Sequence, residues 1–132
     1  MDTPTIKNKK TRIAIDIDGV ITANPPALSW FTYHLMKNEN DIEVYVISWR
    51  NGADVNRMNE TERDLNRFGI SYTSLILAPR KFKTLHESAI WKISIIKAYN
   101  ITMWFDDELK NFSRDLGIDV KALLPDVIQI HI

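Results

Sequence analysis

Short apolar runs alternate with longer amphipathic stretches along the whole chain. The runs are rich in β-branched residues and have the length of strands buried on both faces, whereas the stretches between them repeat apolar residues at helical spacing. Strands are predicted over residues 12–17, 43–48, 74–77, 101–105, 118–123 and 127–132, and helices from residue 25 to about 38 and over 53–68, 85–99 and 109–116. This alternation predicts an α/β domain with a parallel sheet and right-handed crossovers.

Proline and glycine mark several predicted helix ends. Pro25 suits the first turn of the first helix, and Gly69 and Gly117 suit the ends of the second and fourth. Residues 20–24 are expected to form an extended flap or a turn after the first strand. In the second helix, the apolar residues expected to face the sheet are Val55, Met58, Leu65 and Phe68.

Two carboxylates follow the apolar run of the first predicted strand. Asp16 and Asp18 are two positions apart, so on an ideal strand both would project to one face. Two carboxylates that close repel each other, and a divalent cation such as Mg²⁺, which prefers hard oxygen ligands, removes the repulsion. Gly19 then permits a sharp turn. A solvated turn uses the same residue types, but a position directly after a buried strand favours a functional site.

Polar side chains also end the second and fourth predicted strands. Ser48 follows one apolar run, and Asp106 and Asp107 follow another. In open parallel sheets, ligands bind beyond the carboxyl ends of the strands, so these groups should meet Asp16 at one edge of the sheet. Independent polar loops could produce each cluster singly, but the coincidence of three favours a shared site.

A lysine interrupts the apolar face of the third predicted helix. Five side chains share that face at a 4-3-4-3 spacing: Leu85, Ala89, Lys92, Ile96 and Tyr99. A cation there is costly unless it is paired or its head reaches water. We predict that Lys92 pairs with the carboxylates at the sheet edge. Alternatively, Lys92 only extends its head to water, and Lys81 or Lys83 of the preceding loop is the paired cation.

Composition narrows the function classes. Residues 12–132 of this 132-residue chain are predicted to form a single domain, preceded by a flexible N-terminus of residues 1–11. The 17 acidic and 17 basic residues balance, so no overall field favours nucleic acid or an anionic membrane. The absence of cysteine excludes disulfides, thiolate catalysis and cysteine zinc sites. We recognise no signal peptide or membrane-spanning stretch, and a cytoplasmic location is expected.

Four motifs, in order, resemble those of the haloacid dehalogenase (HAD) superfamily, most of whose members are Mg²⁺-dependent phosphatases. They are Ile-Asp16-Ile-Asp18-Gly19-Val, Val-Ile-Ser48-Trp49-Arg50, Trp91-Lys92 and Trp-Phe-Asp106-Asp107. The resemblance covers residues 12–120 and implies a Rossmann-like three-layer α/β/α fold with a central parallel sheet. The gaps at 20–26 and 52–75 leave no room for the cap domain of larger members, so a cap-less member is expected.

The resemblance implies a catalytic role for one or two residues of each of the first three motifs. Asp16 would be the nucleophile that forms an aspartyl-phosphate, and Asp18 would act as general acid and then general base. Ser48 would hydrogen-bond the transferring phosphoryl group, and Lys92 would neutralise that group and Asp16. These roles agree with the physics of phosphoryl transfer, because the phosphoryl oxygens carry the charge through the transition state.

The resemblance also implies Mg²⁺ as cofactor. The ion would be held by Asp16, by the backbone carbonyl of Asp18 and by the Asp106–Asp107 pair. In members with Gly-Asp at the fourth motif, the aspartate aligns with Asp107, so Asp107 is the expected direct ligand and Asp106 its support.

The absence of a cap would leave an open site that suits an extended phosphate ester. The region from Ser48 to Asp107 is similar to the phosphatase domain of polynucleotide 3′-phosphatases, except that Trp49 stands where a small residue is usual. A nucleic-acid 3′ end is therefore one expected substrate. Trp49, Arg50 and Arg80 would stack on a base or grip a phosphate, or else pack as core and surface residues.

Other interpretations stay open. A small nucleotide or sugar phosphate could be the substrate, with a neighbouring subunit as lid. A phospho-receiver domain is a different class, but it expects an aspartate at the end of the third strand, where this chain has Ala78-Pro79. A catalytically inactive binding domain is disfavoured because all four motif residues are present.

Overall fold

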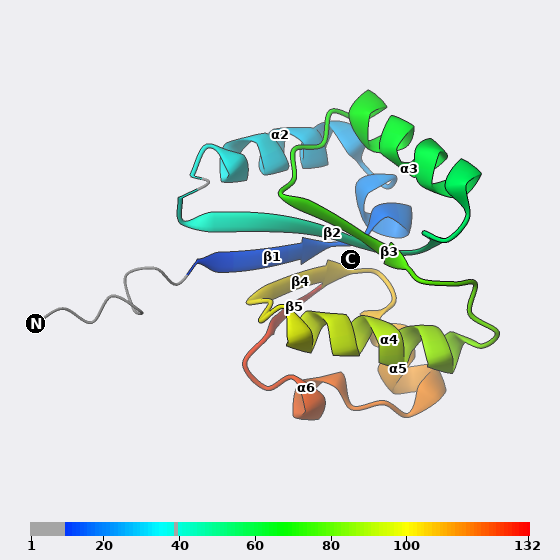
Figure 1. Cartoon of the computed structure of the whole chain (residues 1–132). Coiled ribbons are helices and arrows are strands. Elements are labelled where there is room, and N and C mark those ends of the chain that lie inside the picture. The colour runs from blue at the N-terminus through cyan, green and yellow to red at the C-terminus, as the bar shows by residue number, and fades with distance from the viewer. Residues whose placement is uncertain (1–9, 39) are drawn as a thin grey trace, which may run out of the picture.

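The computed structural model describes residues 10–38 and 40–132. Its elements are β1 (Thr11–Ile15), η1 (Ile17–Ile21), α2 (Pro25–Met36), β2 (Ile42–Asn51), α3 (Val55–Arg67), β3 (Ser74–Ala78), α4 (Leu85–Ala98), β4 (Met103–Asp106), α5 (Leu109–Leu116), α6 (Val120–Leu123) and β5 (Ile128–His131). The strands form one parallel sheet in the order β3-β2-β1-β4-β5. α2 and α3 cover one face, and α4 and α5 cover the other (Figure 1). The expected Rossmann-like three-layer α/β/α fold is confirmed.

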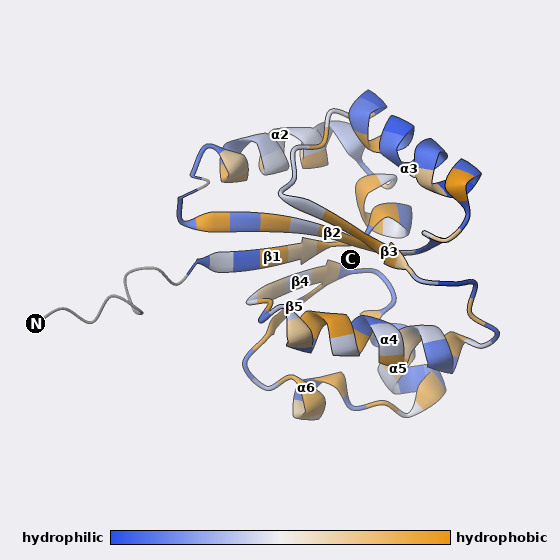
Figure 2. Ribbon diagram, in the orientation of Figure 1, coloured by the Kyte–Doolittle hydropathy of each residue, from blue (hydrophilic) through white to orange (hydrophobic). Residues whose placement is uncertain are grey.

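Side chains of the central strands alternate between two apolar cores. Ile13 and Ile15 of β1 belong to the core under α2 and α3, whereas Ala14 belongs to the core under α4 and α5. On β2, Val44 and Tyr45 divide in the same way. Burial on both faces explains the near-continuous apolar runs of the sequence, which colour much of β1 and β2 orange in Figure 2.

Two strand ends differ from the prediction. β1 ends at Ile15, so the expectation that Asp16 and Asp18 share one strand face is wrong. Asp16 follows the strand, and Asp18 lies in the one-turn segment η1. Of the two forms expected for residues 20–24, a flap or a turn, the structure has the turn. β2 extends to Asn51, beyond the predicted end at Ser48, and its register against β3 shifts between these two residues.

Two further local predictions are wrong. Residues 120–123 form α6 instead of a strand, because the Asp119 side chain accepts the N–H of Ala122 at 3.0 Å and caps a helical turn. Val55 does not face the sheet and is 67% exposed. It occupies the first position of α3 after the capping residue Asp54, whereas Leu65 is buried as predicted.

The expected flexible N-terminus lies mostly outside the described residues, which begin at Lys10, and Thr11 already belongs to β1. Within residues 10–38 and 40–132, η1 is the only element between β1 and α2, and α3 is the only element between β2 and β3. No inserted domain is present in this part of the chain. The described helices are all too short or too polar to cross a membrane.

Candidate functional site

The parallel register brings the ends of β1 and β4 together. Ile15 pairs with Phe105, and the N–H of Asp16 donates to the carbonyl of Phe105 at 3.1 Å. Asp16 and Asp106 each follow these paired residues directly, so they lie side by side at the carboxyl ends of neighbouring strands. Two segments that are far apart in the chain therefore meet at this edge, as the strand-end pattern predicted.

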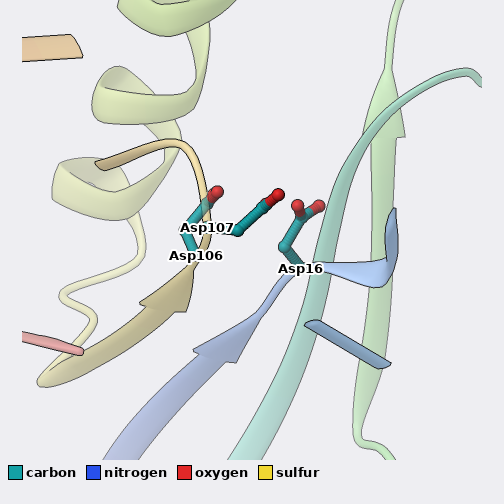
Figure 3. Close-up of side chains that lie close together, drawn as sticks. All are labelled: Asp16, Asp106 and Asp107. Atoms are coloured by element: carbon teal, nitrogen blue, oxygen red, sulfur yellow. The ribbon is translucent and has the colours of Figure 1, made fainter. Parts of the chain in front are cut away.

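Three carboxylates form a compact cluster at this edge. Asp16, Asp106 and Asp107 each offer an oxygen, and these oxygens all lie within 4.8 Å of one another. Figure 3 shows the three side chains converging from the end of β1 and the end of β4. Asp16 and Asp106 are buried, and Asp107 is partly exposed. The carboxylate of Asp18 is not a member of this cluster.

Lys92 of α4 is the cation of the cluster. Its side chain is 1% exposed, and its Nζ lies 2.6 Å from Oδ2 of Asp106 and 3.1 Å from Oδ1 of Asp16. The inward position that the helical spacing predicted is confirmed, and Lys92 does not extend to water. The loop residues Lys81 and Lys83 are exposed and are not among the ion pairs of the described residues.

Gly19 makes room for the carboxylate of Asp107. Gly19 has a φ of +89°, and a Cβ built on it would lie 2.1 Å from Oδ2 of Asp107. A side chain at position 19 would therefore be strained by its backbone and would collide with Asp107. Among the described residues, Oδ1 of Asp107 is buried without a hydrogen-bond partner. The turn after β1 and the turn after β4 are thus packed directly against each other.

The donor set fits a hard divalent cation. The cluster has three carboxylates and one ammonium, which pairs with Asp16 and Asp106, so negative charge is in excess. A buried oxygen of Asp107 has no hydrogen-bond partner in the described part of the chain. Both oxygens of Asp106 already accept hydrogen bonds, from Lys92 and from the N–H of Glu108 at 2.9 Å. Asp16 and Asp107 could therefore hold such a cation directly, with Asp106 orienting the ammonium beside them.

Burial dominates the electrostatics of the cluster. Burial raises the pKa of Asp16 to about 7; Lys92 opposes this shift and the Asp106 carboxylate adds to it. Burial also raises the pKa of Asp107, with the neighbouring carboxylates adding to it. For Lys92, burial alone would lower the pKa, but Asp16 and Asp106 outweigh it and the pKa is raised. The ammonium is therefore charged, and Asp16 is poised between its two protonation states near neutral pH.

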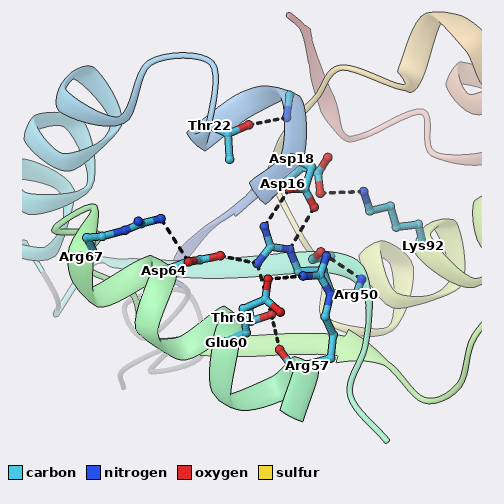
Figure 4. A network of polar contacts seen from close by, with 12 residues as sticks. Asp16, Asp18, Thr22, Arg50, Arg57, Glu60, Thr61, Asp64, Arg67 and Lys92 are labelled. Atoms are coloured by element: carbon cyan, nitrogen blue, oxygen red, sulfur yellow. Dashed lines mark hydrogen bonds and ion pairs between the residues drawn. The ribbon is translucent and has the colours of Figure 1, made fainter. Parts of the chain in front are cut away.

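Asp18 belongs to a second ion-pair centre, built around Arg50 (Figure 4). The guanidinium donates to both oxygens of Asp18, at 3.0 and 2.8 Å, and to Oδ2 of Asp64 at 2.9 Å. It also donates to the hydroxyl of Thr61 at 3.3 Å. The hydrogen bonds from Arg50 lower the pKa of Asp18, so this carboxyl group is ionised at neutral pH.

The second motif forms one wall of the site. Ser48 is buried, and its hydroxyl accepts the N–H of Arg50 at 3.1 Å. The Trp49 indole donates its N–H to the carbonyl of Ser88 at 3.0 Å, and the ammonium of Lys92 lies 4.6 Å from the centre of its ring. Trp49 therefore packs against α4 while still bordering the site. A cavity of about 250 Å³ is lined by Asp16, Asp18, Gly19, Ser48, Trp49, Asp107 and Glu108.

Sequence reasoning missed the residues that hold Arg50. Thr61 and Asp64 are three positions apart on α3, and this spacing places both on the side of the helix that faces Arg50. Thr61 is a polar residue on the buried face of α3, and a polar residue in that position indicates a buried polar partner. Arg80 lies outside the site: it is exposed and pairs with Glu87.

Comparisons with known proteins bear on the fold. No protein-family model and no curated protein matches this chain. One chain of the solved structure "Structure of the Pnkp1/Rnl/Hen1 RNA repair complex" is similar, with a TM-score of 0.64 and 16% sequence identity. The match covers 100% of this chain and 44% of that one, so the present chain spans less than half of its length. At this identity the likeness establishes a shared fold.

Proposed function

We propose that this chain is a HAD-superfamily phosphatase, a Mg²⁺-dependent phosphomonoester hydrolase with Asp16 as nucleophile. One observation carries the proposal: the cluster of Asp16, Asp106 and Asp107 is contacted by the fully buried ammonium of Lys92. Phosphoryl transfer needs a nucleophile surrounded by positive charge, because the phosphoryl oxygens carry negative charge throughout. The fold shared with a chain of an RNA repair complex also supports a phosphate-processing enzyme.

The proposed reaction has two steps. In the first, an oxygen of Asp16 attacks phosphorus, the bond from phosphorus to the leaving oxygen breaks, and that oxygen takes a proton from Asp18. In the second, water attacks the phosphorus, the bond to Asp16 breaks, and Asp18 accepts the proton from water. Dividing the transfer lets a weak nucleophile do both steps at one site. Ser48 donates a hydrogen bond to the phosphoryl group, and the ammonium of Lys92 neutralises its negative charge.

Asp16, Asp107 and the backbone carbonyl of Asp18 would hold Mg²⁺, which when bound neutralises charge on the phosphoryl oxygens. The ion pair with Arg50 favours the ionised form of Asp18, which is the form that accepts a proton in the second step. The first step requires a proton on Asp18. We therefore expect the contact between Asp18 and Arg50 to loosen when substrate enters.

The proposed substrate is an extended phosphate ester, such as a nucleic-acid 3′ end. The described chain has no inserted domain that would close over the cavity between Trp49 and Asp107. The similar chain comes from an RNA repair complex, which supports nucleic acid over a sugar phosphate. Trp49 borders the cavity and Arg50 contacts Asp18, so we expect both residues to lie near the leaving group.

Two other functions are disfavoured by the structure. A phospho-receiver domain needs a carboxylate at the end of β3, but β3 ends at Ala78 and Pro79 follows it. An inactive binding domain would not need the fully buried ion pair of Lys92, because burying ions costs free energy unless a function retains them.

Hydrolysis of an aryl phosphate by the purified chain tests the proposal. We expect turnover that requires Mg²⁺ and that is lost in Asp16→Asn, because the amide is not a nucleophile. Asp126→Asn, at an exposed position, is the matched control and should keep full activity. Absence of turnover, or turnover that survives Asp16→Asn, would refute the proposal. A panel of esters that includes 3′-phosphorylated oligonucleotides and sugar phosphates then identifies the substrate class.

A further inference from the structure

The outer face of α2 carries the most exposed aromatic residues among those described. Trp30 is 65% exposed and Tyr33 is 54% exposed, although the opposite side of the same helix, with Phe31, packs in the core. α3, which covers the same face of the sheet, is almost entirely polar outside, and Figure 2 shows it largely blue beside the paler α2. A helix with apolar groups on both sides has an outer face that is suited to contact with another molecule.

The rings on the outer side of α2 form a ladder that ends at a cation. The Trp30 and His34 rings have centroids 4.5 Å apart, and the Tyr33 and His34 rings are 5.4 Å apart. The ammonium of Lys37 lies 4.9 Å from the centre of the Tyr33 ring. Three rings and one cation therefore follow one another along a single helix face, and the contacts hold the rings in fixed orientations.

A groove runs beside this ladder. Its volume is about 570 Å³, and it is lined by Pro25, Pro26, Ser29, Trp30, Tyr33, Arg67, Phe68 and Gly69. The guanidinium of Arg67 lies 4.9 Å from the centre of the Phe68 ring, so the far wall repeats the pairing of a cation with a ring. Asp64 contacts Arg67 at 3.2 Å, but the Arg67 side chain is 71% exposed, so its guanidinium remains accessible to a ligand in the groove.

The charge of this face selects one class of partner. α2 contains no Asp or Glu from Pro25 to Met36, and Lys37 follows it directly. Exposed rings with cations beside them complement a chain in which planar bases alternate with phosphates. None of the residues that line the groove is acidic, so no carboxylate opposes a phosphate there.

We propose that the aromatic and cationic face of α2, with the groove between α2 and Arg67–Phe68, binds single-stranded nucleic acid. Trp30 and Tyr33 stack on unpaired bases, and Lys37 and Arg67 contact the phosphates. α2 begins seven residues after Asp18, directly after η1, so the end of this face with Pro25 and Pro26 is the end next to the turn that carries Asp18. In the proposed arrangement, the bound strand continues from that end to the carboxylate cluster. In taking that strand as the substrate of the cluster, the inference rests on the proposed function.

Binding can be measured without catalysis. We would record the fluorescence anisotropy of labelled oligo(U), oligo(dT) and a duplex, all with 3′-hydroxyl ends that the proposed hydrolase does not consume, against the full chain. Trp30→Ala and Tyr33→Ala should each raise the Kd for single strands about fivefold or more, because base stacking is lost. Lys37→Gln should make the salt dependence shallower by about 0.7 in slope. The oligo(U) and oligo(dT) arms distinguish RNA from DNA.

The matched controls are Tyr99→Ala and Lys97→Gln, an exposed ring and an exposed cation at the far end of α4, and both should bind as the wild type does. The inference is overturned if single strands do not bind, if Tyr99→Ala weakens binding as much as Trp30→Ala, or if the duplex binds more tightly. It is also overturned if the wild type is a dimer that Trp30→Ala dissociates, since the face would then bind a second copy.

Failure of this inference and failure of the proposed function give different results. Binding that Trp30→Ala weakens, in a chain that hydrolyses no phosphate ester, would keep the surface and reject the hydrolase. Mg²⁺-dependent hydrolysis of an aryl phosphate, without binding of oligonucleotides, would reject the surface and keep the hydrolase.

Discussion

Two cations lie on opposite sides of the turn after β1, and each bridges two carboxylates. The Lys92 centre consists of Lys92 with Asp16 and Asp106, and all three side chains are at most 8% exposed. The second centre has Arg50 in the corresponding place; its side chain is 7% exposed, and that of its partner Asp18 is 58% exposed. The same pairing of charges therefore occurs once inside the protein and once at its surface.

The difference in solvation gives Asp16 and Asp18 opposite acid–base properties. Burial raises the pKa of Asp16 to about 7, whereas the hydrogen bonds from Arg50 lower the pKa of Asp18. Carboxylates only two positions apart in sequence thus acquire distinct protonation behaviour from their surroundings, as acid–base pairs in active sites commonly do. The Lys92 centre should dominate stability and metal binding, and the Arg50 centre should tune a single proton. Four experiments examine this division.

The largest effect is expected for Lys92→Met. It leaves the carboxylates of Asp16 and Asp106 buried without their cation, which should cost about 3–5 kcal/mol of unfolding free energy. Urea unfolding followed by circular dichroism measures the loss. Lys97→Met, on the exposed side of the same helix, should change stability by less than about 0.5 kcal/mol. Equal losses in the two variants would show that the Lys92 centre does not hold the fold together.

Gly19→Ala should weaken Mg²⁺ binding at least about tenfold, or about 1.4 kcal/mol, because the new Cβ displaces the Asp107 carboxylate. Titration calorimetry with Mg²⁺ measures this affinity. Gly117→Ala is the matched control: its φ of +65° imposes similar backbone strain, but no atom lies within 4 Å of the added Cβ. If Gly117→Ala weakens Mg²⁺ binding equally, the contact between Gly19 and Asp107 has no part in metal binding.

The affinity for Mg²⁺ should fall as pH is lowered through about 7. The pKa of Asp16 lies near 7 in the metal-free protein, so below that pH a proton competes with the ion for the same carboxylate. One competing proton reduces the affinity by at most about tenfold per pH unit. Calorimetric titrations at acid, neutral and alkaline pH measure the slope, and a pH-independent affinity would exclude Asp16 as a ligand that must lose a proton.

Arg50→Gln should have the smallest effect, about 1 kcal/mol at neutral pH, because Asp18 is largely exposed and solvent screens its pairing. The folded-state pKa of Asp18 is below its ordinary value of 3.8, so the pair stabilises the fold above that value. The contribution is lost as pH falls through the folded-state pKa, and the stability difference from the wild type should then narrow. Arg57→Gln, in the exposed pair with Glu60, is the control and should cost less.

The fold and the buried centre could be predicted from the sequence because both depend on periodic or local signals. Apolar runs and helical spacings determine which segments are buried, and a lysine in an apolar stripe must find a partner, as Lys92 does with Asp106. The prediction for Asp18 was wrong because the strand ends two residues earlier than expected. Strand ends depend on turn geometry more than on apolar pattern. The partners of Arg50 on α3 could not be predicted, because the packing of this helix on the sheet determines which of its residues contact Arg50.

The pairing of β1 with β4 also determines when during folding the carboxylate cluster can form. The N–H of Arg12 donates to the hydroxyl of Thr102, 90 residues further along the chain, and Asp16 and Asp106 adjoin the same pair of strands. A nascent chain that has not yet released β4 from the ribosome holds Asp16 but lacks Asp106 and Asp107. On the ribosome, the cluster can therefore form only after β4 has emerged, and a truncated product that ends before residue 106 lacks two of its three carboxylates.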